Sequence, residues 1–490
     1  MSSLSVAFLA AEIAPWFKVG GLGDIAASLP EALAREGVRV EVFVPLHRPV
    51  SGDPPEVGER VDEITFCLGE HSVSAAVRAG PSEGARLRFV EIPAFFDREG
   101  LYAGAEPYAD DLGRWTAFCR AVLTLLRERD QPLPVILAND WHACPVLLDP
   151  GFSSPGERPG VVLAIHNLLY QGCFGAEEAT RWGYGPNALA DDHLNLLKTG
   201  ILGADRIVTV SPGYAREILS PEYGGGLHEA LRSRGKKLTG ILNGIDEQEW
   251  NPRTDPALPG AYDAGDMSGR EVCRRELARR CGFELDARRP IAGMVTRFAE
   301  QKGMDLVVDS VPEMLDLGFD LVVQGIGDPP LEDALRSLEE KFPERVRLFA
   351  CYDAELARLV IAASDCLLIP SRYEPCGLNQ MYAQRYGTLP VARRTGGLAD
   401  TITDPRDTQD GVGTGFLFED ASSEALVSAL ARARDLLIDP PRHALFQMVA
   451  MERDFSWARS ARSWISVLES AANDRCTSAG GRFSQGCAPS

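Results

Sequence analysis

The sequence predicts an α/β protein built from two doubly wound, Rossmann-like domains with parallel sheets. Three observations indicate this class. Short apolar segments rich in β-branched residues alternate with longer helical patterns through the whole chain. The 490 residues exceed what one hydrophobic core usually contains. A polar, proline-rich segment, DEQEWNPRTDPALPG, separates two series of strand–helix alternations.

Ten segments are expected to form buried parallel strands. They are SVAFLA, VRVEVFV, PVILA, VVLAI and RIVTV in the first half, then PIAGMV, FDLVVQ, RVRLFA, DCLLIP and LPVAR. The rhythm restarts after the proline-rich segment, which predicts domains at 1–245 and 246–455. Apolar residues at helical spacing in DFSWARSARSWISVLES predict a closing helix at 456–472. Residues 473–490 have little apolar content, so we expect them to be disordered.

The composition excludes several classes of partner. The net charge of −20 would repel nucleic acid and anionic membranes. No stretch approaches the roughly 20 apolar residues of a membrane span, and Glu12 interrupts the first apolar run, which favours a buried strand over a signal peptide. The eleven cysteines are scattered without CxxC pairs. We therefore expect a cytoplasmic protein with reduced thiols and no structural zinc, in which Cys119 and Cys366 are core residues.

A glycine-rich segment, KVGGLGDIAASLPEAL, follows the first predicted strand and leads into a predicted helix. Such a turn lets the backbone approach a ligand, and N–H groups at a helix start favour an anion. A phosphate or sugar-nucleotide site and a plain tight turn are equally compatible with this segment alone. The spacing GGLGD matches neither the dinucleotide fingerprint nor a P-loop.

Polar residues follow several predicted strands, where ligands bind in open α/β sheets. Asp140 comes after PVILAN, His166 after VVLAI, and Arg297 after PIAGMVT. Two cations around one loop, Arg297 and Lys302 in TRFAEQKGMD, can clamp a diphosphate. A solvated loop with a surface ion pair is the alternative interpretation.

The segment PSRYEPCGLNQMYAQRYGTLPVARRTGGLADTI holds a second group of candidates. Glu374 follows the strand DCLLIP, and a carboxylate in such a turn is either a capping group or a catalytic one. Thr395, Gly396 and Gly397 form another glycine turn before a helix, which can hold a second phosphate.

Seven ordered segments resemble one family. KVGGLGD, AIHNLLYQG, TVSPGYAREI, GILNGIDEQEWNP, TRFAEQKG, PSRYEPCGLNQMYAQRYGTLPV and RTGGLADTI look like the bacterial glycogen synthases and plant starch synthases. The resemblance spans the first strand to the closing helix. It implies the GT-B architecture, two Rossmann-like domains facing a deep cleft. It also implies a retaining transfer of glucose from ADP-glucose to the 4-hydroxyl of an α-1,4-glucan such as glycogen.

The resemblance also implies site roles. Lys18, Arg297 and Lys302 would hold the diphosphate, Thr395 and Gly396 would meet the distal phosphate, and Tyr352 would stack on the adenine. His166 and Asn243 would contact the glucose, Asp140 would lie near sugar and acceptor, and Glu374 would sit by the glucose. The implied catalytic residues are Glu374, His166, Asp140, Lys18, Arg297 and Lys302. The remaining implied donor contacts are Gly20, Gly21, Asp24, Cys376, Gly377 and Leu378.

The implied chemistry needs no metal or other cofactor. In the front-face scheme of this family the diphosphate leaves into the cationic clamp, and its own oxygen helps to deprotonate the incoming hydroxyl. A covalent scheme would require two carboxylates about 5 Å apart, and Glu374 and Asp140 come from different domains. A donor held by Lys18 and Arg297 together should favour a closed state of the two domains.

Two segments depart from the family pattern. The usual HDWH reads NDWH here, with Asn139 first, and the DNxxRF-like segment reads DDLGRW at 110–115. Asp110 and Asp111 are interpreted as a solvated charge pair, and His193 and His228 receive no role. Because both departures lie on the acceptor side, two alternatives stay open: another retaining GT-B glycosyltransferase with a different acceptor, and a catalytically silent glucan-binding protein. The oligomeric state is left open by the sequence.

Overall fold

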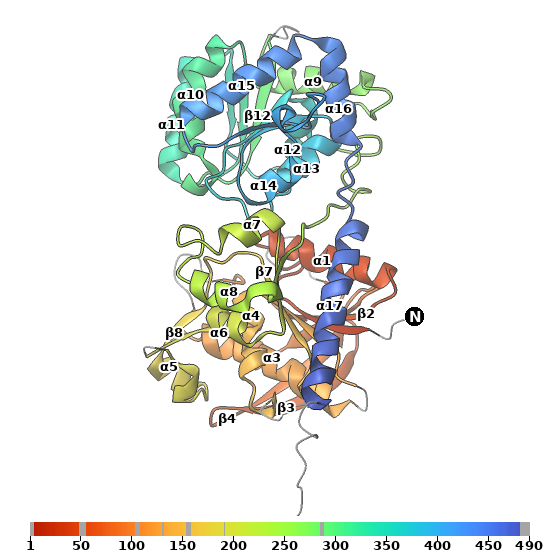
Figure 1. Ribbon diagram of the computed structural model, residues 1–490, viewed down its shortest axis with the longest axis vertical. Coiled ribbons are helices and arrows are strands. Elements are labelled where there is room, and N and C mark those ends of the chain that lie inside the picture. The colour runs from red at the N-terminus through yellow and green to blue at the C-terminus, as the bar shows by residue number, and fades with distance from the viewer. Residues whose placement is uncertain are drawn as a thin grey trace, which may run out of the picture. The chain divides into compact units, whose positions relative to one another are not determined.

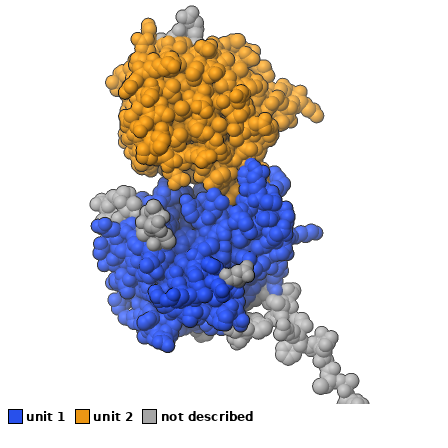
Figure 2. Space-filling model, turned by 90° about the vertical axis from the view of Figure 1, so that its left-hand side faces the viewer, with its two compact units in different colours: residues 1–210, 215–244, 457–490 blue, residues 211–214, 245–456 orange. Residues whose placement is uncertain are grey.

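The computed structural model describes residues 4–48, 55–102, 108–129, 132–152, 158–190, 192–284 and 289–480. The chain forms two compact units, coloured separately in Figure 2. Unit 1 contains residues 1–210, 215–244 and 457–490, and unit 2 contains residues 211–214 and 245–456. The division at 244/245 lies one residue from the expected boundary. The closing helix groups with unit 1, and residues 211–214 group with unit 2, where Ser211 Oγ donates to the Pro375 carbonyl (2.6 Å).

Unit 1 is built on a nine-stranded sheet in the order β11-β10-β7-β6-β1-β2-β5-β4-β3. All neighbours are parallel except β5-β4 and β4-β3. The strands are β1 (Ser5–Leu9), β2 (Arg39–Pro45), β3 (Arg60–Leu68), β4 (His71–Ala79), β5 (Arg86–Glu91), β6 (Val135–Asn139), β7 (Val161–Ile165), β10 (Arg206–Thr209) and β11 (Leu238–Gly240). A small antiparallel pair joins β8 (Cys173–Gly175) and β9 (His193–Asn195).

Helices cover both faces of this sheet (Figure 1). One face packs against α1 (Gly21–Arg35) and α17 (Trp457–Gly480), and the other against α3 (Asp111–Glu128). Successive residues of β1 alternate between the two cores, Phe8 facing one and Leu9 the other. The other helices are α2 (Pro93–Phe96), α4 (Asp140–Ala143), α5 (Ala176–Arg181), α6 (Leu196–Gly203) and α8 (His228–Arg234), with α7 (Pro212–Glu217) divided between the units.

Unit 2 has a six-stranded parallel sheet in the order β14-β13-β12-β15-β16-β17. Numbered within the unit, this is the 3-2-1-4-5-6 order of the doubly wound dinucleotide-binding fold. The strands are β12 (Ile291–Val295), β13 (Asp320–Gln324), β14 (Val346–Phe349), β15 (Cys366–Ile369), β16 (Leu389–Arg393) and β17 (Phe416–Phe418).

Two groups of helices enclose the unit 2 sheet. One core includes residues of α10 (Met304–Asp316), α11 (Pro329–Lys341), α15 (Ser423–Leu437) and α16 (Pro440–Met451). The other includes α9 (Ser268–Cys281), α12 (Ala354–Ala363), α13 (Asn379–Arg385) and α14 (Gly396–Thr401). Short 3-10 segments occur at Cys144–Leu148, Pro150–Phe152, Pro186–Ala188, Gly235–Lys237, Glu300–Lys302 and Pro405–Asp407.

All ten predicted strands are present, and the predicted doubly wound class is confirmed. Cys119 and Cys366 are buried as expected. The antiparallel edge was not predicted, because β3 alternates exposed and buried residues and lacks a continuous apolar run. Among the described residues, no helix combines the length and apolar character needed to cross a membrane.

The C-terminal helix is longer than expected. α17 runs from Trp457 to Gly480, past the end expected at residue 472, and residues 481–490 lie outside the described part of the chain. The helix is anchored by Trp464 and Leu468 in the unit 1 core, and a helix extends easily from an anchored segment because each further residue adds one hydrogen bond.

Candidate active site

Each unit has one point at which the order of its parallel strands reverses, and ligands of open α/β sheets bind there, beyond the carboxyl ends of the strands. In unit 2 the reversal lies between β12 and β15, and in unit 1 between β1 and β6. The sequence-predicted residues Arg297 and Lys302 follow β12, and Glu374 follows β15. Lys18 follows β1, and Asp140 follows β6. The folds therefore bring the predicted candidates to the two reversal points.

At the unit 2 reversal point, Lys302 and Glu374 form an ion pair of 2.7 Å between Nζ and Oε2. The same Oε2 accepts a hydrogen bond from Ser371 Oγ (2.9 Å). The Glu374 side chain is 10% exposed and that of Lys302 is 25% exposed. Two donors thus fix the carboxylate through one of its two oxygens.

The loops that carry this pair are joined by further contacts. Arg372 forms a bidentate pair with Asp305 (2.7 and 2.6 Å), and its backbone N–H donates to the Gln301 carbonyl (2.8 Å). Asn379 Nδ2 donates to the carbonyl of Val295 at the end of β12 (2.7 Å). Bidentate arginine–carboxylate pairs add geometric specificity, so the loop after β12 is held in register with the loop after β15.

Arg297 differs from Lys302 in its surroundings. It is exposed, and it has no ion pair or side-chain hydrogen bond to any residue that the structure describes. Two residues on, Ala299 precedes the 3-10 segment that carries Lys302. The unit 2 site therefore combines one paired cation, one unpaired cation and one carboxylate, and its net charge favours an anionic ligand.

The glycine turn after β16 lies against the Glu374 loop. Gly397 N–H donates to the Glu374 carbonyl (3.1 Å), and a Cβ on Gly397 would lie 2.1 Å from the Cys376 carbonyl oxygen. Gly377 has φ +71°, and Gly396 has φ +43°, both in the region that favours glycine. The turn that begins at the buried Thr395 therefore packs against Cys376 through Gly397, where no side chain would fit.

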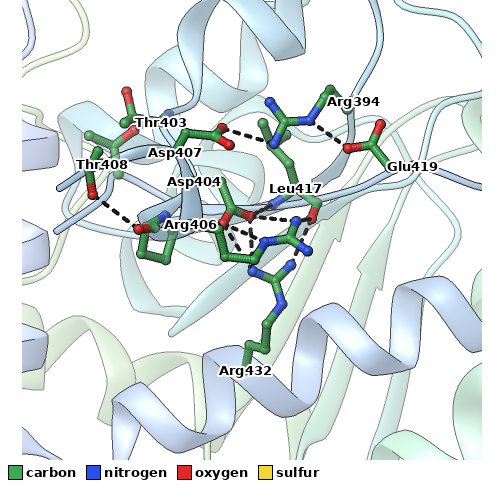
Figure 3. Close-up of polar contacts among 11 residues, drawn as sticks. Arg394, Thr403, Asp404, Arg406, Asp407, Thr408, Leu417, Glu419 and Arg432 are labelled. Atoms are coloured by element: carbon green, nitrogen blue, oxygen red, sulfur yellow. Dashed lines mark hydrogen bonds and ion pairs between the residues drawn. The ribbon is translucent and has the colours of Figure 1, made fainter. Parts of the chain in front are cut away.

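A network of ion pairs supports the strand end before this turn (Figure 3). Arg394 pairs with Asp407 (2.9 Å) and Glu419 (2.8 Å). Asp404 is fully buried and pairs with Arg406 and Arg432, while Leu417 N–H donates to it (2.7 Å). Burial raises the pKa of Asp404, but hydrogen bonds from Arg406, Leu417 and Arg432 outweigh it and lower the pKa to about 2. The network is charged at neutral pH and braces the turn.

Tyr352 and Asn243 differ in exposure to solvent. Tyr352 follows β14 and is 82% exposed, so its ring is available for stacking. Asn243 is buried in the segment after β11, the edge strand of unit 1.

The glycine loop of unit 1 is organised by a residue that the sequence analysis did not select. Glu12, buried at the end of β1, accepts hydrogen bonds from the N–H groups of Val19 (2.8 Å) and Gly20 (2.9 Å). Its other oxygen accepts from the Tyr102 hydroxyl (2.8 Å). Two of the loop N–H groups therefore bind the protein's own carboxylate. The available signal was that Glu12 interrupts an apolar run.

Gly20 and Gly21 lie at the start of α1, and Gly20 has φ −134°. Neither has the positive φ that requires glycine, and an added Cβ at either position would meet no atom within 4 Å. These open positions leave room for a ligand to approach the backbone at the start of α1. Beside them, Lys18 Nζ pairs with Asp24 (2.7 Å), half exposed.

The carboxyl ends of β6 and β7 form a buried polar cluster in unit 1. Asn139 Oδ1 lies 2.8 Å from His166 Nε2, and Asn139 Nδ2 donates to the Leu9 carbonyl (2.8 Å). Asp140 adopts φ +52° and accepts from the N–H groups of His166 (2.8 Å) and Asn167 (3.4 Å). A non-glycine residue at positive φ stores strain that often marks a functional site.

Burial sets the charge of these groups. Desolvation raises the pKa of Asp140 to about 7, against the opposing effect of the N–H groups of His166 and Asn167. Desolvation also lowers the pKa of His166 to about 4 and that of His142 to about 3. At neutral pH both histidines are uncharged, and Asp140 is close to half ionised.

The DDLGRW segment is not a solvated charge pair. Asp111 is buried and pairs with Arg114 (2.9 Å), and Asp110 pairs with Arg98 (2.8 Å). Arg114 is fully buried between the rings of Phe96, Tyr108 and Trp115. The interpretation of Asp110 and Asp111 was wrong because each carboxylate has an arginine partner that sequence spacing does not reveal. Within the described residues, no group of three or more His, Cys, Asp or Glu side chains is arranged to hold a metal ion.

Comparison with family models gives one match in each half of the chain. Residues 5–233 match a model described as the starch synthase catalytic domain, and residues 280–444 match one described as glycosyl transferases group 1.

Curated relatives align over nearly the full length. A glycogen synthase of Myxococcus xanthus is 41% identical over 479 residues, covering 94% of this chain and 98% of that protein. A glycogen synthase of Opitutus terrae is 39% identical over 475 residues, with 94% and 98% covered. One from Anaeromyxobacter dehalogenans is 40% identical over 496 residues, with 96% and 100% covered.

Two solved structures are similar. The catalytic domain of starch synthase IV from Arabidopsis thaliana, bound to ADP and acarbose, has a TM-score of 0.86 and 34% identity, covering 96% of this chain and 100% of that one. Sucrose-phosphate synthase from Thermosynechococcus elongatus has a TM-score of 0.59 and 19% identity, covering 95% and 98%, which shows a shared fold only.

Proposed function

The chain belongs to the family of bacterial glycogen synthases and plant starch synthases, with the GT-B fold, and on this premise we propose that its glucosyl donor is ADP-glucose and its acceptor an α-1,4-glucan such as glycogen. The chain is a glucosyltransferase of glycogen synthesis. The transfer joins glucose to the non-reducing 4-hydroxyl with its anomeric configuration retained. The starch synthase IV domain bound to ADP supports the choice of nucleotide, since ADP is the product that ADP-glucose leaves.

The observation that carries the donor assignment is the unit 2 reversal point. Arg297 is an exposed cation there without an ion pair to any described residue, and Lys302, on the same loop after β12, is held by Glu374 (2.7 Å). Cations fixed where a leaving diphosphate gains charge stabilise the transition state, and removing one such group typically lowers the rate by about 10²–10³. We assign Arg297, Lys302 and Lys18 to the diphosphate, and Thr395 and Gly396 to its distal phosphate.

Glu374 is assigned to the transferred glucose as an acceptor of hydroxyl hydrogen bonds. Its Oε2 is occupied by Lys302 (2.7 Å) and Ser371 (2.9 Å), which fixes its direction. A carboxylate paired in this way is a weak nucleophile, since the ammonium stabilises the charge that attack would spread. The same pair supports the front-face route, in which the leaving phosphate oxygen takes the proton of the acceptor hydroxyl.

The unit 1 groups are assigned to the sugars. His166 and Asn243 contact the transferred glucose, and Asp140 lies near the glucose and the acceptor. Gly20 and Gly21 give the ligand room at the start of α1, and Asp24 orients Lys18 (2.7 Å). Tyr352 stacks on the adenine, and Cys376, Gly377 and Leu378 line the donor site. Charge neutralisation by lysine and arginine means that the reaction requires no metal.

The test is transfer of labelled glucose to a glycogen primer, from ADP-glucose and separately from UDP-glucose, with and without EDTA. Glu374→Ala is the site variant, and Glu340→Ala, an exposed glutamate of α11, is the matched control. We expect labelled polymer from ADP-glucose, insensitive to EDTA, retained in Glu340→Ala and lost in Glu374→Ala. A preference for UDP-glucose would overturn the donor assignment. Binding of ADP-glucose without labelled polymer would show that the acceptor is wrong.

A further inference from the structure

We propose that Asn139 fixes the tautomer of His166, so that the imidazole carries its proton on Nε2 and offers Nδ1 only as a hydrogen-bond acceptor. Asn139 is then a positioning residue, acting on the sugar through His166. The role of His166 toward glucose rests on the proposed function. The tautomer itself rests only on contacts within unit 1 and can be measured without substrate.

The orientation of the Asn139 amide is determined by its neighbours. Its Nδ2 lies 2.8 Å from the Leu9 carbonyl and 3.4 Å from the Leu137 carbonyl, and both are acceptors. The reversed amide would set its oxygen against the Leu9 carbonyl oxygen and would lose this hydrogen bond. The amide NH₂ therefore faces β1, and Oδ1 faces His166.

The amide orientation dictates the proton position on His166. Oδ1 of Asn139 has lone pairs and no hydrogen, so the 2.8 Å contact requires an N–H on Nε2. The other ring nitrogen, Nδ1, is buried and has no hydrogen-bond partner among the described residues. Buried N–H groups without a partner are rarer in proteins than buried acceptors without one, so Nδ1 is the nitrogen that lacks the proton. Both observations select the same tautomer.

The position of the ring is fixed by the strands. Leu9 ends β1, Asn139 ends β6, and His166 directly follows β7, and these three strands are neighbours in the sheet. Asp140 Oδ1 holds the His166 backbone N–H from the same strand end (2.8 Å). A backbone carbonyl oxygen can only accept hydrogen bonds. The Leu9 carbonyl therefore fixes the orientation of the Asn139 amide, and the amide fixes the position of the proton on His166.

The chemistry predicts which ligand His166 accepts. A nitrogen that only accepts hydrogen bonds favours a donating group, and in a sugar that group is a hydroxyl. It disfavours a carbonyl or a carboxylate at the same place, because two acceptors would then face one another. Because Nδ1 is buried in this structure, a sugar hydroxyl that donates to it must first uncover it.

The same reasoning explains the departure from HDWH. Position 139 needs one N–H donor toward the Leu9 carbonyl and one acceptor toward His166. A carboxamide provides both, and so does a neutral imidazole with one protonated and one free nitrogen. Asparagine and histidine are therefore equivalent here, whereas leucine provides neither group and aspartate lacks the donor.

The first measurement is the nitrogen NMR spectrum of the protein labelled with ¹⁵N-histidine. The chain has seven histidines, and His166→Gln identifies the signal of His166. We expect the Nε2–H tautomer in the wild type and in Asn139→His, and its loss in Asn139→Leu. An Nδ1–H tautomer or an imidazolium at neutral pH in the wild type would overturn the proposal.

Kinetics with the proposed donor test the positioning role. We expect kcat/KM within about threefold of wild type for Asn139→His, and a loss of about tenfold or more for Asn139→Leu and Asn139→Asp. Rescue by histidine separates positioning from a general need for asparagine in folding, and the wild-type spectrum still decides if the leucine variant does not fold. Unchanged kcat/KM in Asn139→Leu, with wild-type transfer intact, would overturn the positioning role while leaving the proposed function standing. If the wild type transfers no glucose, the proposed function fails, and the spectrum alone decides the tautomer.

Discussion

The two units place polar side chains at the same point of the same strand order but stabilise them in opposite ways. At the unit 1 reversal point, Asp140 is buried and His166 is half-buried, and backbone and amide groups form hydrogen bonds with them. At the unit 2 reversal point, Lys302 and Glu374 form an ion pair beside the exposed Arg297. Desolvation suppresses charge in the first site, and pairing near solvent preserves it in the second.

This difference matches two kinds of ligand chemistry. Polar groups whose charge is reduced by burial suit the hydroxyls of a sugar, where the direction of each hydrogen bond matters most. Fixed cations suit a diphosphate, where neutralising charge matters most. The same type of fold can therefore recognise both kinds of ligand. The fold determines where the side chains lie, and local burial determines their charge.

The largest expected effect tests the charged half of the comparison. Lys302→Ala should lower kcat for transfer from ADP-glucose by about 10²–10³, because it removes a cation and leaves Glu374 with Ser371 alone. Steady-state kinetics measure the loss. Lys341→Ala, on α11, is the matched control and should retain wild-type kcat. Equal rates in the two variants would mean that Lys302 carries no part of the leaving-group charge.

The next largest expected effect concerns the buried site of unit 1 and the pKa of Asp140. Burial raises the pKa of Asp140 from about 3.9 in the unfolded chain to about 7 in the folded one. The folded state is therefore favoured most below pH 4, and this contribution is lost as the pH rises toward 7. The difference of about 3 pH units corresponds to at most about 4 kcal/mol.

Asp140→Asn keeps an acceptor and tolerates positive φ but does not ionise. Thermal melts should show its stability rising relative to wild type between pH 4 and pH 8. Effects of the buried histidines are common to both proteins and cancel in the difference. A constant difference across this range would show that Asp140 is ionised in the fold as easily as in the unfolded chain.

A smaller effect concerns the exposed ring of unit 2. Tyr352→Ala should raise KM for ADP-glucose about tenfold with kcat nearly unchanged, since stacking of a base on an aromatic ring is worth about 1–3 kcal/mol. Tyr352→Phe keeps the ring and should behave as wild type. Tyr170→Ala, in unit 1, tests whether any exposed tyrosine has this effect. A KM that does not move in Tyr352→Ala would remove Tyr352 from the adenine site.

The smallest effect compares two open glycines of unit 1. Gly20 and Gly175 both precede helices, and a Cβ at either meets nothing within 4 Å. Both glycines are N-cap residues, so both alanine variants should lose a similar stability of about 1 kcal/mol. Gly20→Ala alone should raise KM for the donor about fivefold, because the methyl group meets the ligand at a cost of about 1 kcal/mol. Similar KM values in the two variants would show that the donor does not approach the backbone at Gly20.

The sequence predicted where the site residues lie relative to the strands better than it predicted which side chains contact them. Arg297, Lys302, Glu374, Asp140 and His166 were predicted to follow strands, and each lies in the segment after the carboxyl end of its strand in the structure. That prediction succeeds because parallel strands align their carboxyl ends at one edge of a sheet. Ser371 and Glu12 were not selected, since a serine near a strand and a glutamate in an apolar run have many common explanations.

The local pattern alone determined the two doubly wound units, because buried parallel strands need continuous apolar segments whatever their order. It also determined the loops in which charged residues would lie. Tertiary structure decided the pairs: Lys302 meets Glu374 across 72 residues, and Asn139 meets Leu9 across 130. It also decided the charge states, raising the pKa of Asp140 and lowering that of His166. The physical reason is that burial and long-range contact depend on how distant segments pack, which local spacing does not encode.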